Sequence, residues 1–422
     1  MLKKPKGCFI ICCNIITFER INLKIMSAQH LSDRINNLSV SQTLAMAAKA
    51  RELTALGKDI ISLSLGEPDF NTPDFIKEAA KKAIDENWSN YPPVDGYLEL
   101  KQAIVKKFQR DNGLNYQPAN IVVSTGAKQS LYNIAQVMLN DGDEVILPAP
   151  YWVSYFEIIK MAGGIPVEVP TSVESDFKIT PEQLKAAITP KTKMMWFSSP
   201  CNPSGSVYSK DELAALVEVL KQYENIYVVS DEIYEHINFT GDYCSIGSIS
   251  GMFDRTITVN GVAKAFAMTG WRIGYIGAPE FIAKACTKLQ GQVTSGANSI
   301  AQRATITALE ADPSEIGYMV EAFHKRRDLV MKLVNDIPGL KVNQPEGAFY
   351  VFPDVSYYFG KTLKGILINN ADELALFLLE HANVATVTGA AFGNSNCLRL
   401  SYATSEEMIS EAFRRIKEAL AG

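Results

Sequence analysis

Apolar residues along the chain follow two periodicities, one typical of buried strands and one typical of amphipathic helices. Continuous apolar, β-branched runs predict strands at 121–125, 144–147, 194–198, 227–230, 256–259 and 274–278. Between them, apolar residues at helical spacing predict a helix over residues 127–140. Capping boxes at 180–183 and 209–212 mark the starts of two further helices. Strands that are apolar throughout and alternate with helices indicate an α/β fold, with a mainly parallel sheet covered by helices on both faces.

The pattern changes after about residue 310, where long helical periods flank a few short apolar runs. We expect helices over residues 315–336, 371–382 and 405–420. We expect strands at 341–342, 348–352, 384–387 and 397–401. This arrangement indicates a smaller α+β domain, to which the N-terminal segment contributes. The predicted division is an extension over residues 1–25, an arm and part of the small domain over 26–71, a large domain over 72–310 and the small domain over 311–422.

The first 25 residues differ from the rest of the chain. Three lysines precede an apolar stretch from Cys8 to Phe18, which superficially resembles a signal peptide. The stretch is interrupted by Asn14, is too short to span a bilayer and is not followed by an A-x-A cleavage site. Met26 opens a segment that is typical of a cytosolic start. We therefore expect residues 1–25 to be a disordered or mis-started extension, with a targeting role as the alternative, and we expect no transmembrane helix.

Composition narrows the class of protein. The 422 residues are 47% hydrophobic and 21% charged, which is typical of a soluble globular protein with a large core. Lysine and arginine number 41 against 46 acidic residues, and a net charge of −5 argues against nucleic-acid binding through phosphate neutralisation. Four scattered histidines and seven cysteines without a C-x-x-C pair predict no metal site. The same cysteine pattern favours a reducing, cytoplasmic location.

Polar residues follow several of the predicted strands, and ligands of open α/β sheets bind at these carboxyl ends. Gly126, Ala127 and Lys128 lie between the first strand and a helix, where backbone N–H groups can bind a phosphate. Asn202 lies in the turn S-S-P-C-N-P-S-G after the third strand. Asp231 ends the next strand, where a buried carboxylate costs several kcal/mol unless it has a cationic or hydrogen-bonding partner.

Three further residues add to this set. Tyr234 lies three residues after Asp231, and Lys264 and Arg272 follow the strand at 256–259. Some of these features have a purely structural alternative, since the glycine turn can be a simple connection, the segment around Asn202 a simple turn and Lys264 a side chain directed to solvent. Lys264 can instead be a desolvated, reactive amine, and Arg272 can bind an anion. Together the residues supply an amine, an acid, a phenol, an amide and a phosphate-binding turn. These parts can hold a phosphorylated aldehyde cofactor with a pyridine ring.

Longer motifs carry a family resemblance over about residues 30–421. In chain order they are SLGEPDF, YPPVDGYLELKQAI, GAKQSLYN, PAPYWVSY, SSPCNPSG, SDEIYEH, NGVAKAFAMTGWRIGY and LRLSYA. The chain resembles the class I aminotransferases, in particular the aspartate aminotransferase family of fold type I pyridoxal-phosphate enzymes. It is most similar to the prokaryotic-type subgroup that includes aspartate and aspartate/prephenate aminotransferases.

The resemblance implies that the cofactor is pyridoxal 5′-phosphate and that the large domain binds it. The residues that it places around the cofactor are Tyr91, Gly126, Ala127, Lys128, Trp152, Asn202, Asp231, Tyr234, Lys264 and Arg272. Lys264 is implied to bind the cofactor covalently, and Asp231 to pair with the pyridine nitrogen. Tyr234 and Asn202 are implied to hydrogen-bond the phenolic oxygen, and Trp152 to stack on the ring.

The resemblance also implies contacts to the substrate and to a second subunit. Arg399 is implied to bind the α-carboxylate of the substrate, and Gly66 to contact the same group through its backbone. Tyr91 is implied to reach the phosphate of the other subunit, so we expect a homodimer with shared active sites. Some relatives have phosphate-binding hydroxyls at two positions that are Gly261 and Ala263 here, so the phosphate depends more on its other ligands.

The implied activity is ping-pong transamination, with L-aspartate as donor and 2-oxoglutarate as acceptor. Lys128 is expected to bind the distal carboxylate together with Thr43, which lies in a segment similar to the flap of the family's N-terminal arm. Trp152 and Asn202 are also expected next to the substrate. Alternatives are an aminotransferase for prephenate, aromatic or other amino acids, or a lyase on the same scaffold. This sequence has no helix-turn-helix signal, which argues against a DNA-binding ligand sensor. It also has no glycine fingerprint, which argues against a nicotinamide dehydrogenase.

Overall fold

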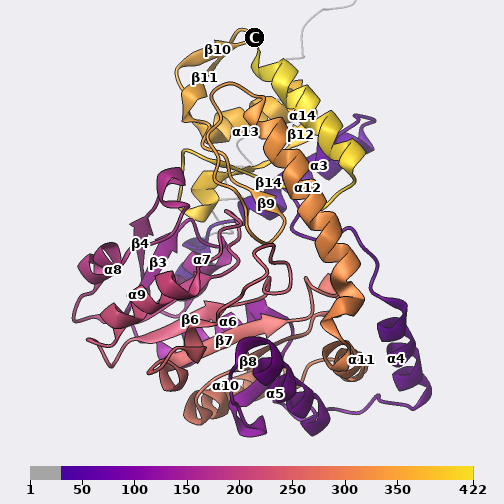
Figure 1. The fold of residues 1–422 in the computed structure, drawn as a ribbon, viewed down its shortest axis with the longest axis vertical. Coiled ribbons are helices and arrows are strands. Elements are labelled where there is room, and N and C mark those ends of the chain that lie inside the picture. The colour runs from indigo at the N-terminus through magenta and orange to yellow at the C-terminus, as the bar shows by residue number, and fades with distance from the viewer. Residues whose placement is uncertain (1–29, 422) are drawn as a thin grey trace, which may run out of the picture. The chain divides into compact units, whose positions relative to one another are not determined.

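The computed structural model describes residues 30–421. The chain divides into two compact units, one ending at Val40 and one beginning at Ser41. In the described part of the first unit, α2 (Asp33–Asn36) begins after Ser32, whose side chain accepts a hydrogen bond from the Ile35 amide. The predicted extension over residues 1–25 lies outside the described residues. The second unit contains the elements described below (Figure 1).

A seven-stranded sheet is the centre of the second unit, in the order β2-β8-β7-β6-β5-β3-β4. Its strands are β2 (Ile121–Ser124), β3 (Glu144–Ala149), β4 (Ile165–Pro170), β5 (Thr192–Ser198), β6 (Tyr227–Asp231), β7 (Thr256–Gly261) and β8 (Gly274–Gly277). Neighbouring strands from β4 through to β7 are parallel, whereas β8 runs antiparallel to both β2 and β7. The carboxyl ends of β5, β6 and β7 therefore meet at one edge of the sheet.

Both faces of this sheet are covered by helices, and the alternation of side chains along β2 shows why. Val122 packs into a core with α6 (Ala127–Met138), α7 (Ser154–Met161) and α10 (Glu280–Val293). Ile121 and Val123 face the opposite way. Their core includes α4 (Asp74–Asp85), α5 (Leu98–Asn112) and α11 (Ser299–Glu310). A third core beneath β5 and β6 includes α8 (Pro181–Ala187) and α9 (Lys210–Leu220). The predicted fold class is confirmed.

A second group of elements lies above the sheet in Figure 1. Its strands are β1 (Ile61–Ser62), β9 (Tyr350–Val351), β10 (Lys361–Leu363), β11 (Ile366–Ile368), β12 (Val384–Ala385), β13 (Val387–Thr388) and β14 (Leu398–Ser401). Its helices are α3 (Gln42–Ala55), α12 (Gly317–Asn335), α13 (Ala371–His381) and α14 (Glu406–Leu420). The strands form the antiparallel sheet β13-β14-β9, the parallel pair β1-β12 and the hairpin β10-β11.

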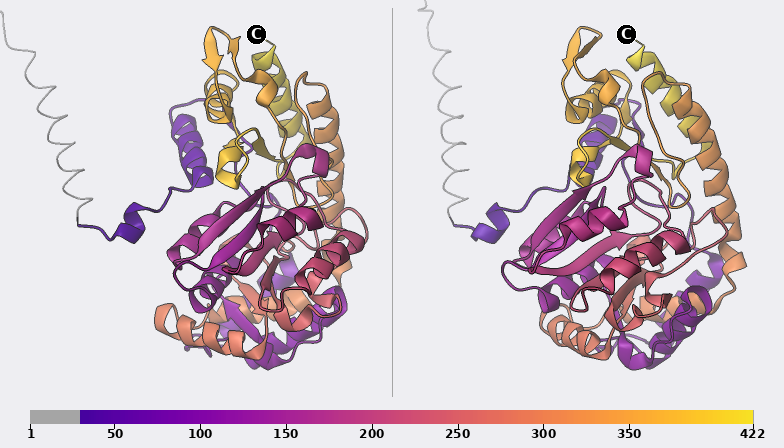
Figure 2. Two further views of the ribbon diagram at one scale, coloured as in Figure 1. Left: turned by 90° about the vertical axis from the view of Figure 1, so that its left-hand side faces the viewer. Right: turned by 60° about the vertical axis from the view of Figure 1, so that its left-hand side comes forward.

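The segment after Ser41 belongs with these C-terminal elements. Ala50 and Leu53 of α3 share a core with Leu379 and Ala385. Figure 2 shows the ribbon of α3 next to the C-terminal elements from two further directions. This contact supports the interpretation that part of residues 26–71 joins the small domain, and the exact division of the chain stays a prediction.

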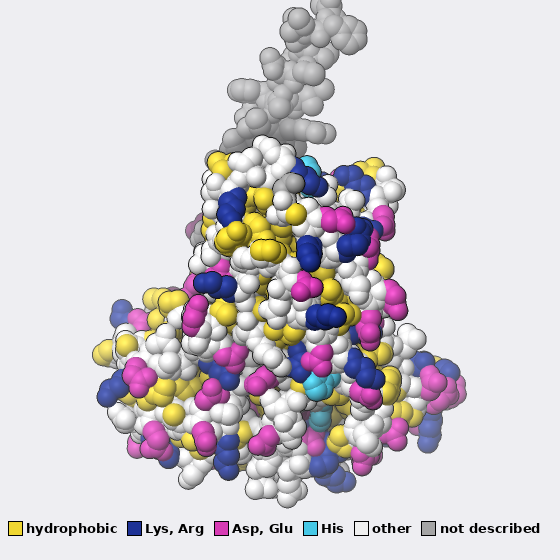
Figure 3. All heavy atoms as spheres, turned by 45° about the horizontal axis from the view of Figure 1, so that its top comes forward, with side chains coloured by type: hydrophobic (Ala, Val, Ile, Leu, Met, Phe, Trp, Pro, Cys, Tyr) yellow, Lys and Arg dark blue, Asp and Glu magenta, His cyan; other side chains and the backbone are white. Residues whose placement is uncertain are grey.

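The structure differs from the sequence-based expectations in several strands. β1, β10 and β11 were not predicted, and the run expected to be one strand at 384–387 forms β12 and β13, which belong to different sheets. Residues 341–342 were expected to form a strand, which is wrong, because Lys341 makes only an isolated antiparallel bridge with Asp354. The edge strand β4 was not predicted, since Pro166 and Pro170 lack the N–H groups that a typical strand donates. Within residues 30–421, every helix falls short of the length or hydrophobicity that a membrane crossing requires. On the face drawn in Figure 3, basic and acidic side chains are intermixed.

Candidate active site

All predicted site residues except Tyr91 line one cavity of about 310 Å³, at the carboxyl ends of β5, β6 and β7. They are Thr43, Gly66, Gly126, Ala127, Lys128, Trp152, Asn202, Asp231, Tyr234, Lys264, Arg272 and Arg399. Tyr91 does not line the cavity. It lies between α4 and α5, and 96% of its surface is exposed.

Asp231 is the last residue of β6, and its side chain is buried. The Tyr155 hydroxyl donates a hydrogen bond of 2.7 Å to Oδ2, and the Ile233 amide donates one of 3.3 Å to Oδ1. Burial raises the pKa of Asp231 to about 6, although the bond from Tyr155 acts in the opposite direction. The carboxylate is therefore held in place by neutral donors and is available to a cationic ligand group.

Lys264 lies in the loop after β7, and its ammonium group points into the cavity instead of outward to solvent. Nζ donates a hydrogen bond of 2.5 Å to the carbonyl oxygen of Gly66. Burial lowers the pKa of Lys264 to about 8, Glu67 opposes this shift, and the charges of Arg399 and Arg272 add to it. A substantial fraction of the amine is therefore neutral near pH 8, the form that reacts as a nucleophile.

The turn between β2 and α6 forms an anion site. Helix α6 begins at Ala127 without a side-chain cap, so its first N–H groups have no partner within the helix. Gly126 has φ of +83°, and a Cβ at this position would overlap the guanidinium of Arg272. Arg272 Nη1 donates a 2.8 Å hydrogen bond to the carbonyl of Thr269, which fixes the guanidinium beside the turn. The helix N-terminus and the guanidinium together suit a phosphate.

Lys128 and Trp152 lie together at the mouth of this turn. The side chain of Lys128 is exposed, and its Nζ lies 4.9 Å from the centroid of the Trp152 ring. Partial desolvation lowers the pKa of Lys128, and the charge of Arg272 acts in the same direction. The ammonium is thus held by an aromatic face and not by a carboxylate.

Arg399 is buried in β14 and lines the same cavity. Its Nη1 donates to Oδ1 of Asn202 at 3.1 Å, and its Nη2 donates to the carbonyl of Ser64 at 2.6 Å. Nε has no hydrogen-bond partner among the described residues. The guanidinium lies between the rings of Tyr350 and Phe392, 4.7 and 5.0 Å from their centroids. A buried guanidinium without a carboxylate partner suits a ligand carboxylate.

Charge is unbalanced around the cavity. Its four cationic side chains are Lys128, Lys264, Arg272 and Arg399. Within the described part of the chain, none of the four forms an ion pair with a carboxylate. The acidic residues that line the cavity are Glu67 and Asp231. The cavity therefore fits a ligand that brings several negative charges.

Comparison with known proteins agrees with this geometry. A family model described as aminotransferase class I and II matches residues 58–416. The chain belongs to this family. An aspartate/prephenate aminotransferase of Cereibacter sphaeroides is 50% identical to it over 395 residues, which cover 93% of this chain and 99% of that protein.

Solved structures of aspartate aminotransferases share the fold. The enzyme from Rhizobium meliloti matches with a TM-score of 0.90 and 44% identity, covering 93% of this chain and 99% of that chain. The enzyme from Thermus thermophilus with maleate matches with a TM-score of 0.87 and 43% identity, covering 92% and 99%. The predicted family and fold are thereby confirmed.

Aminotransferases of this family use pyridoxal 5′-phosphate, so the chain is a pyridoxal-phosphate-dependent aminotransferase. The residues of the cavity fit this cofactor. The uncapped start of α6 and Arg272 suit its phosphate, the buried carboxylate of Asp231 suits a protonated ring nitrogen, and the partly neutral amine of Lys264 suits its aldehyde. The predicted cofactor and enzyme class are confirmed.

Three residues of this aminotransferase cavity were not predicted from the sequence. Tyr155 donates to Asp231, Tyr350 contacts Tyr234 and Arg399, and Glu67 lies close enough to Lys264 to raise its pKa. Tyr155 and Glu67 lie within motifs that contain a predicted residue, so the motif was the available signal for these two, whereas Tyr350 lies outside all of the quoted motifs. The contacts themselves depend on the tertiary structure.

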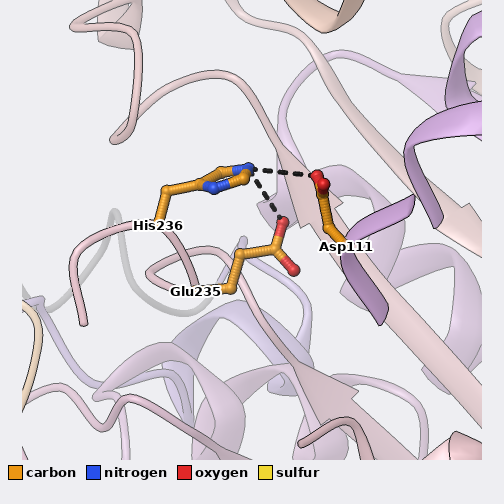
Figure 4. A group of neighbouring side chains, drawn as sticks. All are labelled: Asp111, Glu235 and His236. Carbon is orange, nitrogen blue, oxygen red and sulfur yellow. Dashed lines mark ion pairs between the residues drawn. The ribbon is translucent and has the colours of Figure 1, made fainter. Parts of the chain in front are cut away.

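A second polar cluster lies outside the aminotransferase cavity (Figure 4). Asp111, Glu235 and His236 place possible metal-ligand atoms within 4.8 Å of one another, and Nε2 of His236 points toward both carboxylates. The ammonium of Lys107 forms ion pairs with Glu235 and, at 3.8 Å, with Asp111. Arg110 forms a further ion pair with Asp111 at 2.5 Å, so two cations of the chain balance the two carboxylates of this cluster.

Proposed function

We propose that this aminotransferase moves the amino group of L-aspartate to 2-oxoglutarate and releases oxaloacetate and L-glutamate. The observation that carries the proposal is the set of four unpaired cations around a cavity that contains a partly neutral lysine. The cofactor phosphate and the two carboxylates of a dicarboxylic amino acid together supply the negative charges that these cations lack.

Each predicted cofactor ligand has a distinct part in this proposal. The first N–H groups of α6 and Arg272 bind the phosphate. Asp231 holds a proton on the ring nitrogen, and Trp152 covers the ring. Asn202 accepts from Arg399 through Oδ1, so its Nδ2 is left to donate, together with Tyr234, to the phenolic oxygen.

When bound, pyridoxal phosphate supplies an aldehyde carbon that exchanges amino groups and a ring that accepts charge from the substrate's Cα. Lys264 would hold the bound cofactor at its aldehyde carbon. As a free amine, Lys264 would serve as the general base and acid for the proton of the substrate's Cα. Its lowered pKa suits both roles, because the amine gains and loses a proton near pH 8.

The two carboxylates of the substrate fix the orientation of the amino acid in the cavity. Arg399 binds the α-carboxylate with two N–H groups, a geometry that a lysine reproduces poorly, and the backbone of Gly66 borders the same place. Lys128 and Thr43 bind the distal carboxylate from the other side. Both line the cavity, and each has some solvent exposure, as a substrate entrance requires.

Assembly and location complete the proposal. A homodimer would explain why Tyr91, although aromatic and almost fully exposed, lies away from the cavity that it is expected to serve. In the dimer Tyr91 completes the phosphate site of the partner. We also infer a cytoplasmic location, which is supported by Cys201, Cys244, Cys286 and Cys397 being free thiols.

The visible spectrum of the cofactor-loaded protein tests the function. Addition of single amino acids should abolish the lysine-linked absorbance band at the lowest concentration for aspartate and glutamate, and 2-oxoglutarate should restore it. A band that aspartate leaves unchanged contradicts the proposed donor. Release of a 2-oxo acid or ammonia in repeated turnovers without a second substrate indicates a lyase instead.

Prephenate is a second candidate acceptor, because the relative at 50% identity is named aspartate/prephenate aminotransferase. Prephenate also carries two carboxylates, which Arg399 and Lys128 could bind in the same way. Restoration of the band by prephenate after its removal by glutamate supports this activity. No restoration at concentrations where 2-oxoglutarate acts restricts the enzyme to the aspartate reaction.

A further inference from the structure

Tyr350 connects two parts of the active site that come from different sheets. It lies on β9 and is completely buried, yet it lines the cavity. Ser401 of β14 is its partner across the antiparallel pair, so Arg399 is its diagonal neighbour on the same face. Diagonal pairs are within reach of aromatic and long side chains. The strand register therefore places the Tyr350 ring against the guanidinium of Arg399.

The hydroxyl of Tyr350 reaches across to the large sheet. Its oxygen lies 2.7 Å from the hydroxyl oxygen of Tyr234, and the two rings meet edge to face at 5.8 Å. A Cβ on Gly66 would overlap the same hydroxyl, so glycine at 66 is needed for Tyr350 to occupy this position. The carbonyl of Gly66 in turn accepts the hydrogen bond from Lys264. The side chain of Tyr350 thus contacts Tyr234, Arg399 and Gly66, which all line the cavity.

The direction of the hydrogen bond follows from the role proposed for Tyr234. Burial raises the pKa of both phenols, so each keeps its proton, and either oxygen could donate across the 2.7 Å contact. A hydroxyl has one proton to donate. With the proton of Tyr234 directed to the phenolic oxygen of the cofactor, Tyr350 is the donor of the bond between the two phenols.

We propose that Tyr350 is a positioning residue that orients the Tyr234 hydroxyl toward the cofactor and the Arg399 guanidinium toward the substrate. The inference rests on the proposed roles of Tyr234 and Arg399. Its two contacts are separable, because the hydroxyl acts on Tyr234 and the ring face acts on Arg399. Through a chain of hydrogen bonds, donation by Tyr350 makes Tyr234 a stronger donor to the phenolic oxygen.

The hydroxyl is tested with Tyr350→Phe in the cofactor-loaded protein. The readout is the pH midpoint of the visible absorbance change. Loss of the hydroxyl weakens donation from Tyr234, so the ionised phenolic oxygen is less stabilised and the midpoint should rise by about half a pH unit. Tyr402→Phe is the matched control, because Tyr402 is buried in the same core but lies outside the cavity, with its hydroxyl 3.4 Å from the Ala348 carbonyl.

The ring is tested with Tyr350→Leu and the affinity for maleate, a dicarboxylate that does not react. Loss of the aromatic face should raise the dissociation constant, measured by spectral titration, by roughly five- to thirtyfold. Tyr350→Phe keeps the ring and should rescue this affinity to within about twofold of wild type. A purely structural role would lower thermal stability in both tyrosine variants without separating the two readouts.

Three results decide the inference. An unchanged midpoint in Tyr350→Phe, or an equal shift in Tyr402→Phe, overturns the role of the hydroxyl. Equal loss of maleate affinity in the Phe and Leu variants overturns the role of the ring. If the wild-type protein itself shows no lysine-linked absorbance band, the proposed function fails first, and this outcome is distinguishable because it does not involve Tyr350.

Discussion

The protein has buried charged groups at two neighbouring places near the end of β6, and the two places differ in how these charges are paired. Asp231 faces the cavity with Lys264, and the next residue, Glu232, shares the amide of Asn112 with Glu235 of the second polar cluster. Asp231 and Glu232 are adjacent at the end of the same strand and are both buried. The two places differ in whether the lysine has a carboxylate partner, since Lys107 pairs with Glu235 and Lys264 donates only to the carbonyl of Gly66.

In the second cluster, opposite charges and hydrogen bonds compensate one another. The Asn112 amide donates to Glu232 at 2.8 Å and to Glu235 at 2.6 Å, and Lys107 forms an ion pair with Glu235. Burial alone would raise the pKa of Glu235, yet Lys107 and His236 hold it below its usual value. Burial raises the pKa of Glu232 to about 7, although Ser245 donates to its carboxylate.

In the cavity, by contrast, Lys264 donates only to a backbone carbonyl, and Arg399 binds an amide and a carbonyl. Buried charges that are paired can hold a fold together, whereas buried charges left without partners perturb pKa values and attract ligands. The comparison teaches that pairing, more than burial or residue type, distinguishes the active site from a structural cluster in this chain.

The largest effect is expected at the unpaired lysine. Lys264→Ala should lower turnover by roughly 10⁴-fold or more, because one amine serves as both cofactor anchor and proton carrier. The variant should fold and retain the cofactor non-covalently, which circular dichroism and absorbance can check. A transamination rate within about tenfold of wild type would contradict the assignment of Lys264 as cofactor anchor and proton carrier.

The paired lysine should show the opposite behaviour. Lys107→Met leaves the buried carboxylate of Glu235 without its ammonium partner and should lower the free energy of unfolding of the apoprotein by about 3–5 kcal/mol. Lys264→Met removes a buried cation that has no carboxylate partner, so it should change stability by less than about 1 kcal/mol or raise it. Urea denaturation of the two apoproteins measures both. Equal losses of stability would remove the distinction between the two places.

The sequence predicted much of the fold because strand and helix periods are local properties. The runs at 121–125 and 227–230 became β2 and β6 with boundaries shifted by one residue. Register and direction are not local. The antiparallel direction of β8 depends on its neighbours, and β4, with two prolines, forms a strand because it is an edge strand beside β3.

The candidate site was predictable where a residue's motif identified it, as for Asp231 and Lys264. Tyr155 and Tyr350 were missed, although both have hydroxyls within 2.7 Å of a predicted residue. Both are also ordinary core aromatics by sequence pattern. Their partners are 76 and 116 residues away in the chain, so only the tertiary structure shows that these phenols are polar ligands.

Substitution of the exposed Tyr91 tests whether a second chain contributes a hydrogen bond to the phosphate site. Tyr91→Phe should weaken cofactor retention by about 1.5–3 kcal/mol, the range for a hydrogen bond to a charged group. Dialysis of the loaded protein against buffer, followed by absorbance, measures the loss.

Subunit mixing separates a shared site from a local effect. Lys264→Ala protomers mixed with Tyr91→Ala protomers at limiting cofactor should regain activity, because one site of the mixed dimer is intact. Lys264→Ala mixed with Arg399→Ala is the control and should regain none, since both residues line the cavity of a single chain. A monomer by light scattering at micromolar concentration would contradict the dimer.

The lowered pKa of Lys264 should appear in the rate of cofactor binding. Only the neutral amine attacks the aldehyde, and the neutral fraction of a group with pKa about 8 rises about tenfold between pH 7 and pH 9. The rate at which the lysine-linked band forms in the apoprotein should therefore rise by about the same factor. A rate that keeps rising by about tenfold per pH unit above pH 9 would show that Lys264 has an ordinary pKa, and that its burial has no chemical consequence.

The smallest effect is expected for Lys128, the cation that contacts an aromatic face and no carboxylate. A helix N-terminus together with an ammonium makes a strong anion site, so Lys128→Ala should raise the KM for aspartate and lower kcat/KM by about tenfold or more, or roughly 1.4 kcal/mol. Slow turnover of alanine or of an aromatic donor should be nearly unchanged, because neither carries a distal carboxylate. Steady-state kinetics with the three donors measures the difference. Equal losses for all donors would mean that Lys128 serves the cofactor phosphate or the fold, and the distal carboxylate would then have to be bound by Thr43 or by another residue of the cavity.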